Sequence, residues 1–169
     1  ASASNSVVCN GNTTSLTASG AATYTWTGGI TNGTNFTPTV TTTYSVTGTS
    51  VEGCTNTTVQ TITVNSTPTI SANSASICSG QTATLIASGA NTYTWSNSVT
   101  GSSQTVNPTS TTIYTVSGTN ASGCTNTTNA QIVLVSPSIT LSSLNPTICE
   151  GKTTTITANG ATSYTWNTN

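Results

Sequence analysis

One block of sequence occurs three times in this chain, and the repetition constrains the fold more than any other feature. Each copy begins with Cys-x-Gly, continues through an alternating stretch to Gly-Ala, and ends in Tyr-Thr-Trp. The copies cover residues 9–26, 78–95 and 149–166, so the period is about 70 residues. A fixed period of this kind is typical of a chain built from repeated structural units.

A second block follows the first in two of the three copies. It has the form Tyr-x-Val-x-Gly-Thr, then Gly-Cys-Thr-Asn-Thr-Thr, over residues 44–58 and 114–128. Proline-containing segments at 65–68 and 136–137 separate the copies, and proline interrupts a β-ladder and stiffens a junction. These boundaries predict repeat units at residues 1–65 and 66–136, and a partial unit with only its first strands at 137–169.

Apolar and polar residues alternate along the recurring segments, which is the pattern of half-buried β-strands. No helical periodicity occurs. Short strands at regular spacing, with turns between them, predict an all-β chain of immunoglobulin-like β-sandwich domains arranged head to tail. The inward-facing side chains expected in the core are Leu16, Tyr24, Trp26, Tyr44, Val46, Leu85, Tyr93, Trp95, Tyr114 and Val116.

Two aromatic residues occupy places that have a special role in immunoglobulin-type domains. Trp26 stands where such a domain keeps the buried tryptophan of strand C, and Tyr44 stands where strand F could begin with a tyrosine corner. The alternative is that both are ordinary core aromatics. The segment between them, residues 28–41, has room for one or two short strands.

Charged side chains are almost absent, which excludes several classes of function. The whole chain carries one basic and two acidic residues, Lys152, Glu52 and Glu150, and no histidine. No basic patch is available for nucleic acid, and no cationic or long apolar segment for a membrane. No pair of carboxylates, nucleophile with a base, or close set of metal ligands can be assembled. We therefore expect neither enzyme activity nor a cofactor or metal.

The five cysteines recur at fixed places in the repeats and predict disulfides formed in an oxidising compartment. They are Cys9, Cys54, Cys78, Cys124 and Cys149. The simplest pairing lies within a repeat and joins Cys9 to Cys54 and Cys78 to Cys124. In an immunoglobulin-type sandwich, however, the turn before strand B and the turn between strands F and G lie at opposite ends, too far apart for a disulfide.

A bond between neighbouring repeats avoids this difficulty, and we prefer it slightly. It joins Cys9 to Cys124. Cys54 would then pair with a cysteine of a preceding repeat, and Cys78 with a cysteine in the rest of the third repeat. The number of strands between Trp26 and Tyr44 is expected to decide: two strands place the cysteines of one repeat apart, and one places them together. Bonds between repeats would make the array a stiff rod that resists extension.

The combination of Cys-x-Gly, Leu-x-Ala-x-Gly-Ala, Tyr-x-Trp, Thr-Tyr-x-Val-x-Gly-Thr and Gly-Cys resembles the immunoglobulin-like or PKD-like repeats of large surface proteins in Bacteroidota. It is similar to the repeats of giant gliding adhesins and other cargo of the type IX secretion system. The resemblance covers both whole repeats and the partial one. It implies a cell-surface or secreted location, a long array, and a role in adhesion or display without catalytic residues.

The leading hypothesis is a structural repeat segment of a long extracellular adhesin or surface filament that supports adhesion or gliding, or extends a binding tip. Its partners would be neighbouring repeats of the same chain, surface polysaccharide or other cell-surface proteins. One alternative is a spacer of a secreted enzyme with weak glycan affinity. Another is a subunit of a polymer built by strand exchange. The Thr-x-Thr rows also raise ice or polysaccharide binding, although threonine is common in strands for its shape alone.

Overall fold

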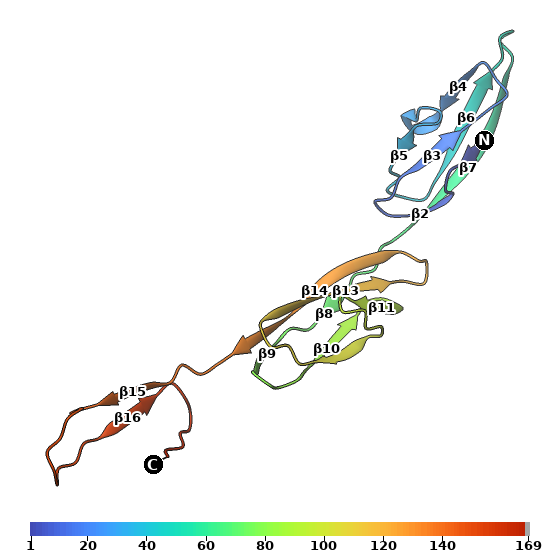
Figure 1. Ribbon diagram of the computed structural model, residues 1–169. Coiled ribbons are helices and arrows are strands. Elements are labelled where there is room, and N and C mark those ends of the chain that lie inside the picture. The colour runs from blue at the N-terminus through green and yellow to red at the C-terminus, as the bar shows by residue number, and fades with distance from the viewer. Residues whose placement is uncertain (168–169) are drawn as a thin grey trace.

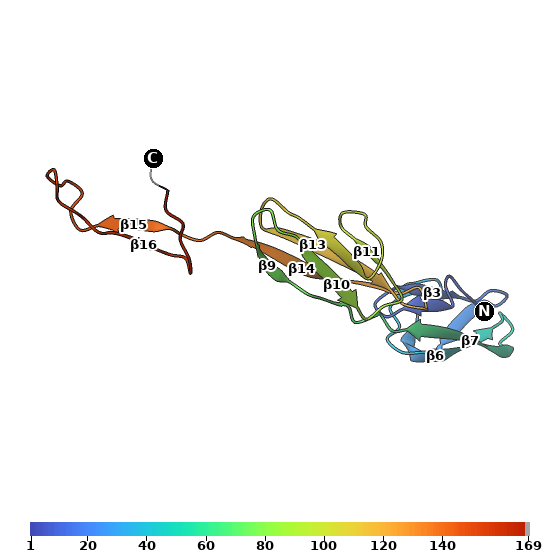
Figure 2. The same cartoon turned by 90° about the horizontal axis from the view of Figure 1, so that it is seen from below.

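The computed structural model describes residues 1–167, which form an all-β chain with one short 3-10 turn, η1 (Thr27–Gly29). The strands fall into three groups in chain order, and Figure 1 shows these groups spread along one long axis. The same succession is seen from below in Figure 2. The all-β prediction is confirmed, because the alternating segments of the sequence form the strands.

The first group, called unit 1, consists of two sheets. A three-stranded sheet has the order β1 (Ser2–Ala3), β3 (Thr14–Thr17), β5 (Asn35–Phe36). A four-stranded sheet has the order β2 (Val7–Cys9), β7 (Thr55–Asn65), β6 (Thr42–Thr49), β4 (Thr23–Trp26). Neighbouring strands are antiparallel except β2 and β7, which run parallel.

The second group, called unit 2, repeats this plan. Its three-stranded sheet has the order β8 (Ser71–Ala72), β10 (Ala83–Ser88), β12 (Ser103–Val106). Its four-stranded sheet has the order β9 (Ala75–Cys78), β14 (Thr125–Val135), β13 (Thr112–Thr119), β11 (Thr92–Trp95). The parallel pair is again the second strand with the last, here β9 with β14.

Each unit has its own apolar core, an arrangement consistent with a β-sandwich. Burial alternates strictly along β10, where every second side chain is buried and the others are exposed. Of the side chains predicted for the core, seven are buried: Leu16, Trp26, Val46, Leu85, Tyr93, Trp95 and Val116. The remaining three, Tyr24, Tyr44 and Tyr114, are half-buried and pack against these clusters.

Of the two alternatives for Tyr44, the tyrosine corner is not formed. Its ring packs edge-on against Phe36, with the ring centroids 5.3 Å apart, and its hydroxyl has no hydrogen-bond partner among residues 1–167. The hydroxyl that closes a turn belongs to Tyr24 instead. It accepts from the N–H of Ala21 at 2.7 Å and donates to the carbonyl of the same residue at 2.9 Å. The buried Trp26 lies on β4, and its indole N–H donates to Asn32.

The third group is a two-stranded sheet, β15 (Thr140–Ser143) with β16 (Ile156–Asn159). The recurring Tyr-Thr-Trp segment, which belongs to β4 in unit 1 and to β11 in unit 2, forms no strand at residues 164–166. The equivalent segments β4 and β11 pair with β6 and β13, and no counterpart of those strands exists among residues 137–167. Leu141, Ile156 and Trp166 therefore remain more than half exposed.

Candidate functional site

The most distinctive feature of the molecule is a covalent joint between unit 1 and unit 2. Cys9, at the end of β2, forms a disulfide with Cys124, in the turn before β14. Their Cα atoms are 5.6 Å apart, within the usual range for a disulfide. This bond between repeats is the pairing slightly preferred from the sequence over a bond within one repeat. Two connections thus join the units: the disulfide and the linker at residues 66–70.

The geometry of β7 explains why Cys9 cannot reach Cys54. Cys54 directly precedes β7, whereas Cys9 lies beside Asn65, the last residue of the same strand. A strand rises about 3.3 Å per residue, so the two cysteines are separated by roughly the length of β7, on the order of 35 Å. A disulfide requires Cα atoms within about 7 Å. The sulfur of Cys9 is instead at the end of unit 1 that faces unit 2.

The expected rule about strand number is wrong. Between Trp26 and Tyr44 the chain forms a single strand, β5, and yet the two cysteines of the repeat lie at opposite ends. The reason is that β5 pairs with β3 and so belongs to the other sheet. The chain crosses between the sheets through residues 27–34. The number of strands between Trp26 and Tyr44 therefore does not determine at which end of the unit the Cys54 turn lies.

The turn that carries Cys124 is organised by Asn120. The side-chain oxygen of Asn120 accepts hydrogen bonds from the backbone N–H groups of Ser122 at 3.0 Å and Cys124 at 2.9 Å. Its amide nitrogen donates to the carbonyl of Ser66 at 2.8 Å, across the junction. Asn120 therefore holds the shape of the turn and attaches the linker to it. Cys124 is completely buried in this arrangement.

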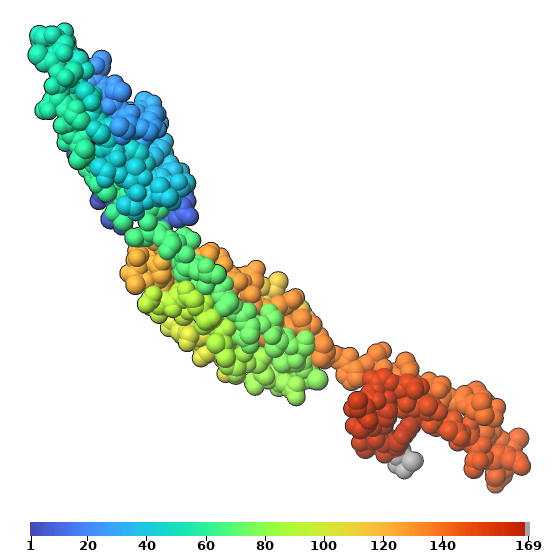
Figure 3. Space-filling view, turned by 180° about the vertical axis from the view of Figure 1, so that it is seen from behind, coloured from blue at the N-terminus to red at the C-terminus, as the bar shows by residue number. Residues whose placement is uncertain are grey.

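The linker lies against unit 2 along the next few residues. The amide of Asn126 donates to the carbonyl of Pro68 at 3.0 Å, and Pro68 itself is buried. The carbonyl of Thr69 lies so close to Gly89 that a Cβ atom there would overlap it. Ile70 packs on the unit 2 core and similarly occupies the space beside Gly118. Figure 3 shows the two units meeting end to end at this linker.

The other three cysteines, Cys54, Cys78 and Cys149, are exposed and unbonded in the described part of the chain. Cys54 lies at the end of unit 1 opposite the junction, and Cys78 ends β9 at the far end of unit 2. The predicted partners of Cys54 and Cys78 belong to a preceding repeat and to the rest of the third repeat. Those pairings stay predictions.

Sequence reasoning missed two elements of this site. The hydrogen bonds of the Asn120 side chain could not be inferred from the repeats, because the equivalent residue in unit 1 is Ser50. The Ser50 hydroxyl accepts from the N–H groups of Glu52 and Cys54 at 3.3 Å. The tyrosine whose hydroxyl closes a turn could have been found from a repeated motif. Gly-Ala-x-x-Tyr occurs in all three repeats, and Tyr93 and Tyr164 bond the alanine N–H as Tyr24 does.

No family model matches this chain, and no curated protein is significantly similar to it. Within residues 1–167, no group of three or more histidine, cysteine or acidic side chains lies close enough together to hold a metal ion. None of the helical segments within residues 1–167 is long and apolar enough to cross a membrane. What the site does provide is a disulfide, and such bonds persist in oxidising, non-cytoplasmic compartments.

Proposed function

We propose that this chain is a non-catalytic structural segment of a long extracellular adhesin or surface filament. The observation that carries the proposal is the doubly connected junction, in which a short linker and the Cys9–Cys124 bond join two similar units end to end. A protein that must project a binding surface away from a cell needs length and a fixed direction. Covalent joints between successive units supply both.

The surface of the units agrees with this role. The outer face of β6 and β7 carries rows of threonine whose hydroxyls bond across the strands, at 2.8 Å for Thr43 with Thr61 and 3.1 Å for Thr47 with Thr57. A neutral, hydroxyl-rich surface stays hydrated without attracting charged partners. The resemblance to immunoglobulin-like repeats of gliding adhesins in Bacteroidota, exported by the type IX system, points to the same class of protein.

The proposal is tested by locating the protein on intact producing cells. Cells are labelled with an antibody raised against residues 66–136 and viewed by electron microscopy, with cells lacking the protein as the control. We expect label along thin filaments that project from the cell surface. If filaments are labelled, the same antibody added to live cells is expected to reduce attachment or gliding.

Label found only on soluble material in the medium would contradict the proposal. In that case the better account is a spacer carried by a secreted enzyme. Sedimentation of the labelled material, followed by assays for hydrolysis of polysaccharides, would then identify the attached activity.

A further inference from the structure

We propose that the open end of unit 1 is a docking socket for another repeat of the same type, placed before Ala1 in a longer polypeptide, and that Cys54 forms there a disulfide equivalent to Cys9–Cys124. This inference rests on the proposed function, because it names the partner by which such an array continues. Unit 1 and unit 2 have equivalent ends, of which that of unit 2 is occupied by the linker and that of unit 1 is open.

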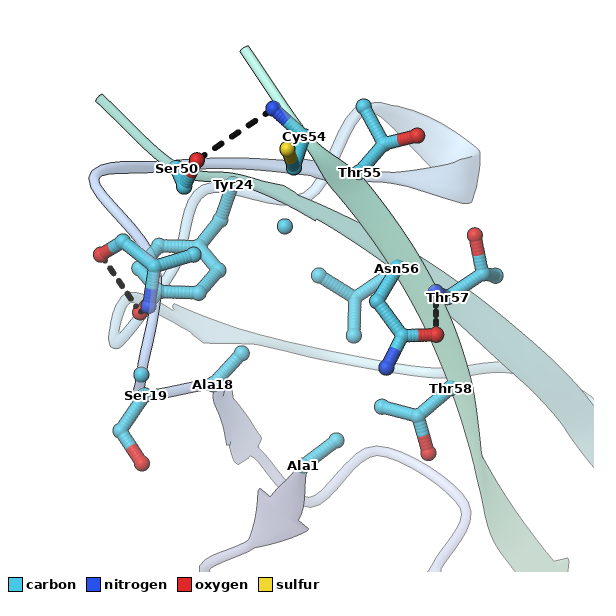
Figure 4. A pocket seen from close by; sticks show the side chains of 14 residues that line it. Ala1, Ala18, Ser19, Tyr24, Ser50, Cys54, Thr55, Asn56, Thr57 and Thr58 are labelled. Atoms are coloured by element: carbon cyan, nitrogen blue, oxygen red, sulfur yellow. Dashed lines mark hydrogen bonds between the residues drawn. The ribbon is translucent and has the colours of Figure 1, made fainter. Parts of the chain in front are cut away.

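The open end contains a cavity of about 310 Å³. Figure 4 shows its lining, with Tyr24 and Ala18 on one side, Asn56 and Thr58 on the other, and Cys54 at the rim. Gly20, Ala21 and Gly48 complete the wall. No side chain of residues 1–167 fills this space, and a Cβ atom built on Gly20 would meet nothing within 4 Å.

The equivalent space in unit 2 is filled by the linker. Gly89 and Gly118 stand in unit 2 where Gly20 and Gly48 stand in unit 1. The backbone of Thr69 covers Gly89, and Ile70 covers Gly118. In the third repeat the carbonyl of Ser138 lies over Gly160 in the same way. The turn glycine is thus covered by a linker in two repeats and uncovered in the first.

The polar groups at the open end match those that hold the linker in unit 2. The side-chain N–H of Asn126 donates to the carbonyl of Pro68, and its side-chain oxygen accepts from the N–H of Thr127. Asn56, the equivalent residue in unit 1, accepts from Thr57 N–H at 2.8 Å, and its amide nitrogen has no partner in the described part of the chain. The socket therefore offers a free donor at the place where a linker carbonyl would lie.

The cysteines show the same contrast. Cys124 is fully buried under the linker, whereas Cys54, in the equivalent turn, is exposed. The turn geometry is already set in unit 1, because Ser50 N–H donates to the carbonyl of Cys54 at 2.9 Å, as Asn120 N–H does to Cys124. Only the second sulfur and the covering segment are missing.

These contacts define what the occupant must contain. It must present a Cys-x-Gly turn like the one at Cys9 or Cys78, followed at the end of its last strand by a linker with proline. Linkers of this kind, Thr67-Pro68-Thr69 and Ser136-Pro137-Ser138, precede unit 2 and the third group of strands. Ala1 and Ile70 each stand eight residues before a Cys-x-Gly motif, so the linker would end directly before Ala1.

The bond-forming step is an ordinary thiol–disulfide exchange. The thiolate of Cys54 attacks a small oxidised disulfide such as oxidised glutathione, and one reduced glutathione leaves. The thiolate of the incoming cysteine then attacks the mixed disulfide and releases the second. Two thiols are oxidised, one glutathione disulfide is reduced to two thiols, and the two protons pass to solvent or to the leaving thiolates.

The test supplies an occupant from the protein itself. A second copy of residues 66–138 is placed directly before Ala1 of the full chain, so that Ser136-Pro137-Ser138 leads into unit 1. Cys78 and Cys149 of the original part are replaced by serine, which leaves the added Cys78 as the expected partner of Cys54. After refolding with oxidised and reduced glutathione, peptic digestion at low pH and mass spectrometry identify the linked peptides.

We expect a peptide pair joining the added Cys78 to Cys54, and loss of alkylation of Cys54, with the Cys9–Cys124 pair unchanged. A Cys54→Ser version of the extended chain serves as the control and should lack only that pair. Cys54 that stays alkylatable in monomers, or a pair found only in covalent dimers, would overturn the proposal.

A second measurement does not depend on oxidation. In the original chain Gly20→Ala should shift the urea midpoint less than Gly89→Ala does, and in the extended chain the two shifts should become similar. An unchanged effect of Gly20→Ala would show that the socket stays empty. Neither readout requires filaments on cells, so failure of this joint is distinguishable from failure of the proposed adhesin function.

Discussion

At the scale of single residues, equivalent positions in the two units carry different constraints because only one is covered by a linker. Gly20 and Gly89 both adopt positive φ, +94° and +101°, in the same turn. Gly20 is open on its Cβ side, whereas Gly89 lies under the backbone of Thr69. Comparing alanine substitutions at Gly20 and Gly89 therefore separates the cost of backbone strain from the cost of steric overlap with the linker.

We predict that Gly89→Ala destabilises the full chain more than Gly20→Ala. Both substitutions place alanine in an unfavourable backbone region, at a cost on the order of 1–3 kcal/mol. Gly89→Ala adds displacement of the linker, and overpacking of this kind typically costs about 1–3 kcal/mol more. Urea unfolding followed by tryptophan fluorescence measures the difference, and equal midpoints would contradict the linker position.

Asn120 supports the buried cysteine and the linker at once, so its removal should affect both. We predict that Asn120→Ala lowers the free energy of unfolding by about 1–3 kcal/mol, chiefly because the N–H of the buried Cys124 loses its partner, together with the exposed Ser122 N–H and Ser66 carbonyl. It should also accelerate reduction of Cys9–Cys124 by dithiothreitol. The control is the same kind of substitution in unit 1, Asn56→Ala, which removes one exposed hydrogen bond and should change neither quantity appreciably.

At the scale of elements, the turn between the two sheets is closed by a tyrosine hydroxyl. Tyr93 is buried on β11 and bonds both the N–H and the carbonyl of Ala90, at 2.7 and 3.0 Å. Tyr114 lies on the adjacent strand, half-buried, and its hydroxyl has no partner among the described residues. The two tyrosines thus differ in burial and in the use of the hydroxyl.

We predict that Tyr93→Phe destabilises unit 2 by about 1–2 kcal/mol, because two backbone groups lose a partner that only the hydroxyl supplies. Tyr114→Phe should change stability by less than about 0.5 kcal/mol, as is usual for a substitution that removes no buried interaction. Denaturant unfolding of both variants gives the comparison. A larger effect at Tyr114 would show that the turn is held in another way.

The strands themselves are largely predictable from sequence, since alternation in segments such as residues 83–88 leaves one consistent choice of inward face. The core tryptophans follow from the same rule. The use of tyrosine hydroxyls does not, because alternation places a ring without telling what its hydroxyl bonds. The path after Trp26 is similarly underdetermined, since a segment rich in glycine and asparagine can pair in either sheet.

At the scale of the whole molecule, the Cys9–Cys124 bond couples two units that are otherwise joined by a linker and a few hydrogen bonds. We predict that replacing both cysteines by serine lowers the free energy of unfolding by on the order of 4–5 kcal/mol, the value that loop closure gives for a loop of this size. Replacing the exposed Cys54 and Cys78 by serine should have little effect. Calorimetry of the two double variants tests the difference.

The same bond decides how the molecule would bear tension. A pull on the two ends passes from Cys9 directly to Cys124, so the intervening chain, a loop with a sequence separation of 115, is shielded from the load. At about 3.5 Å per residue, roughly 400 Å of contour length is locked away. Single-molecule stretching should release that length only after a reductant is added; release from the oxidised chain would contradict this load path. If the chain is part of a surface fibre that is pulled by flow, unfolding between Cys9 and Cys124 would not lengthen that fibre.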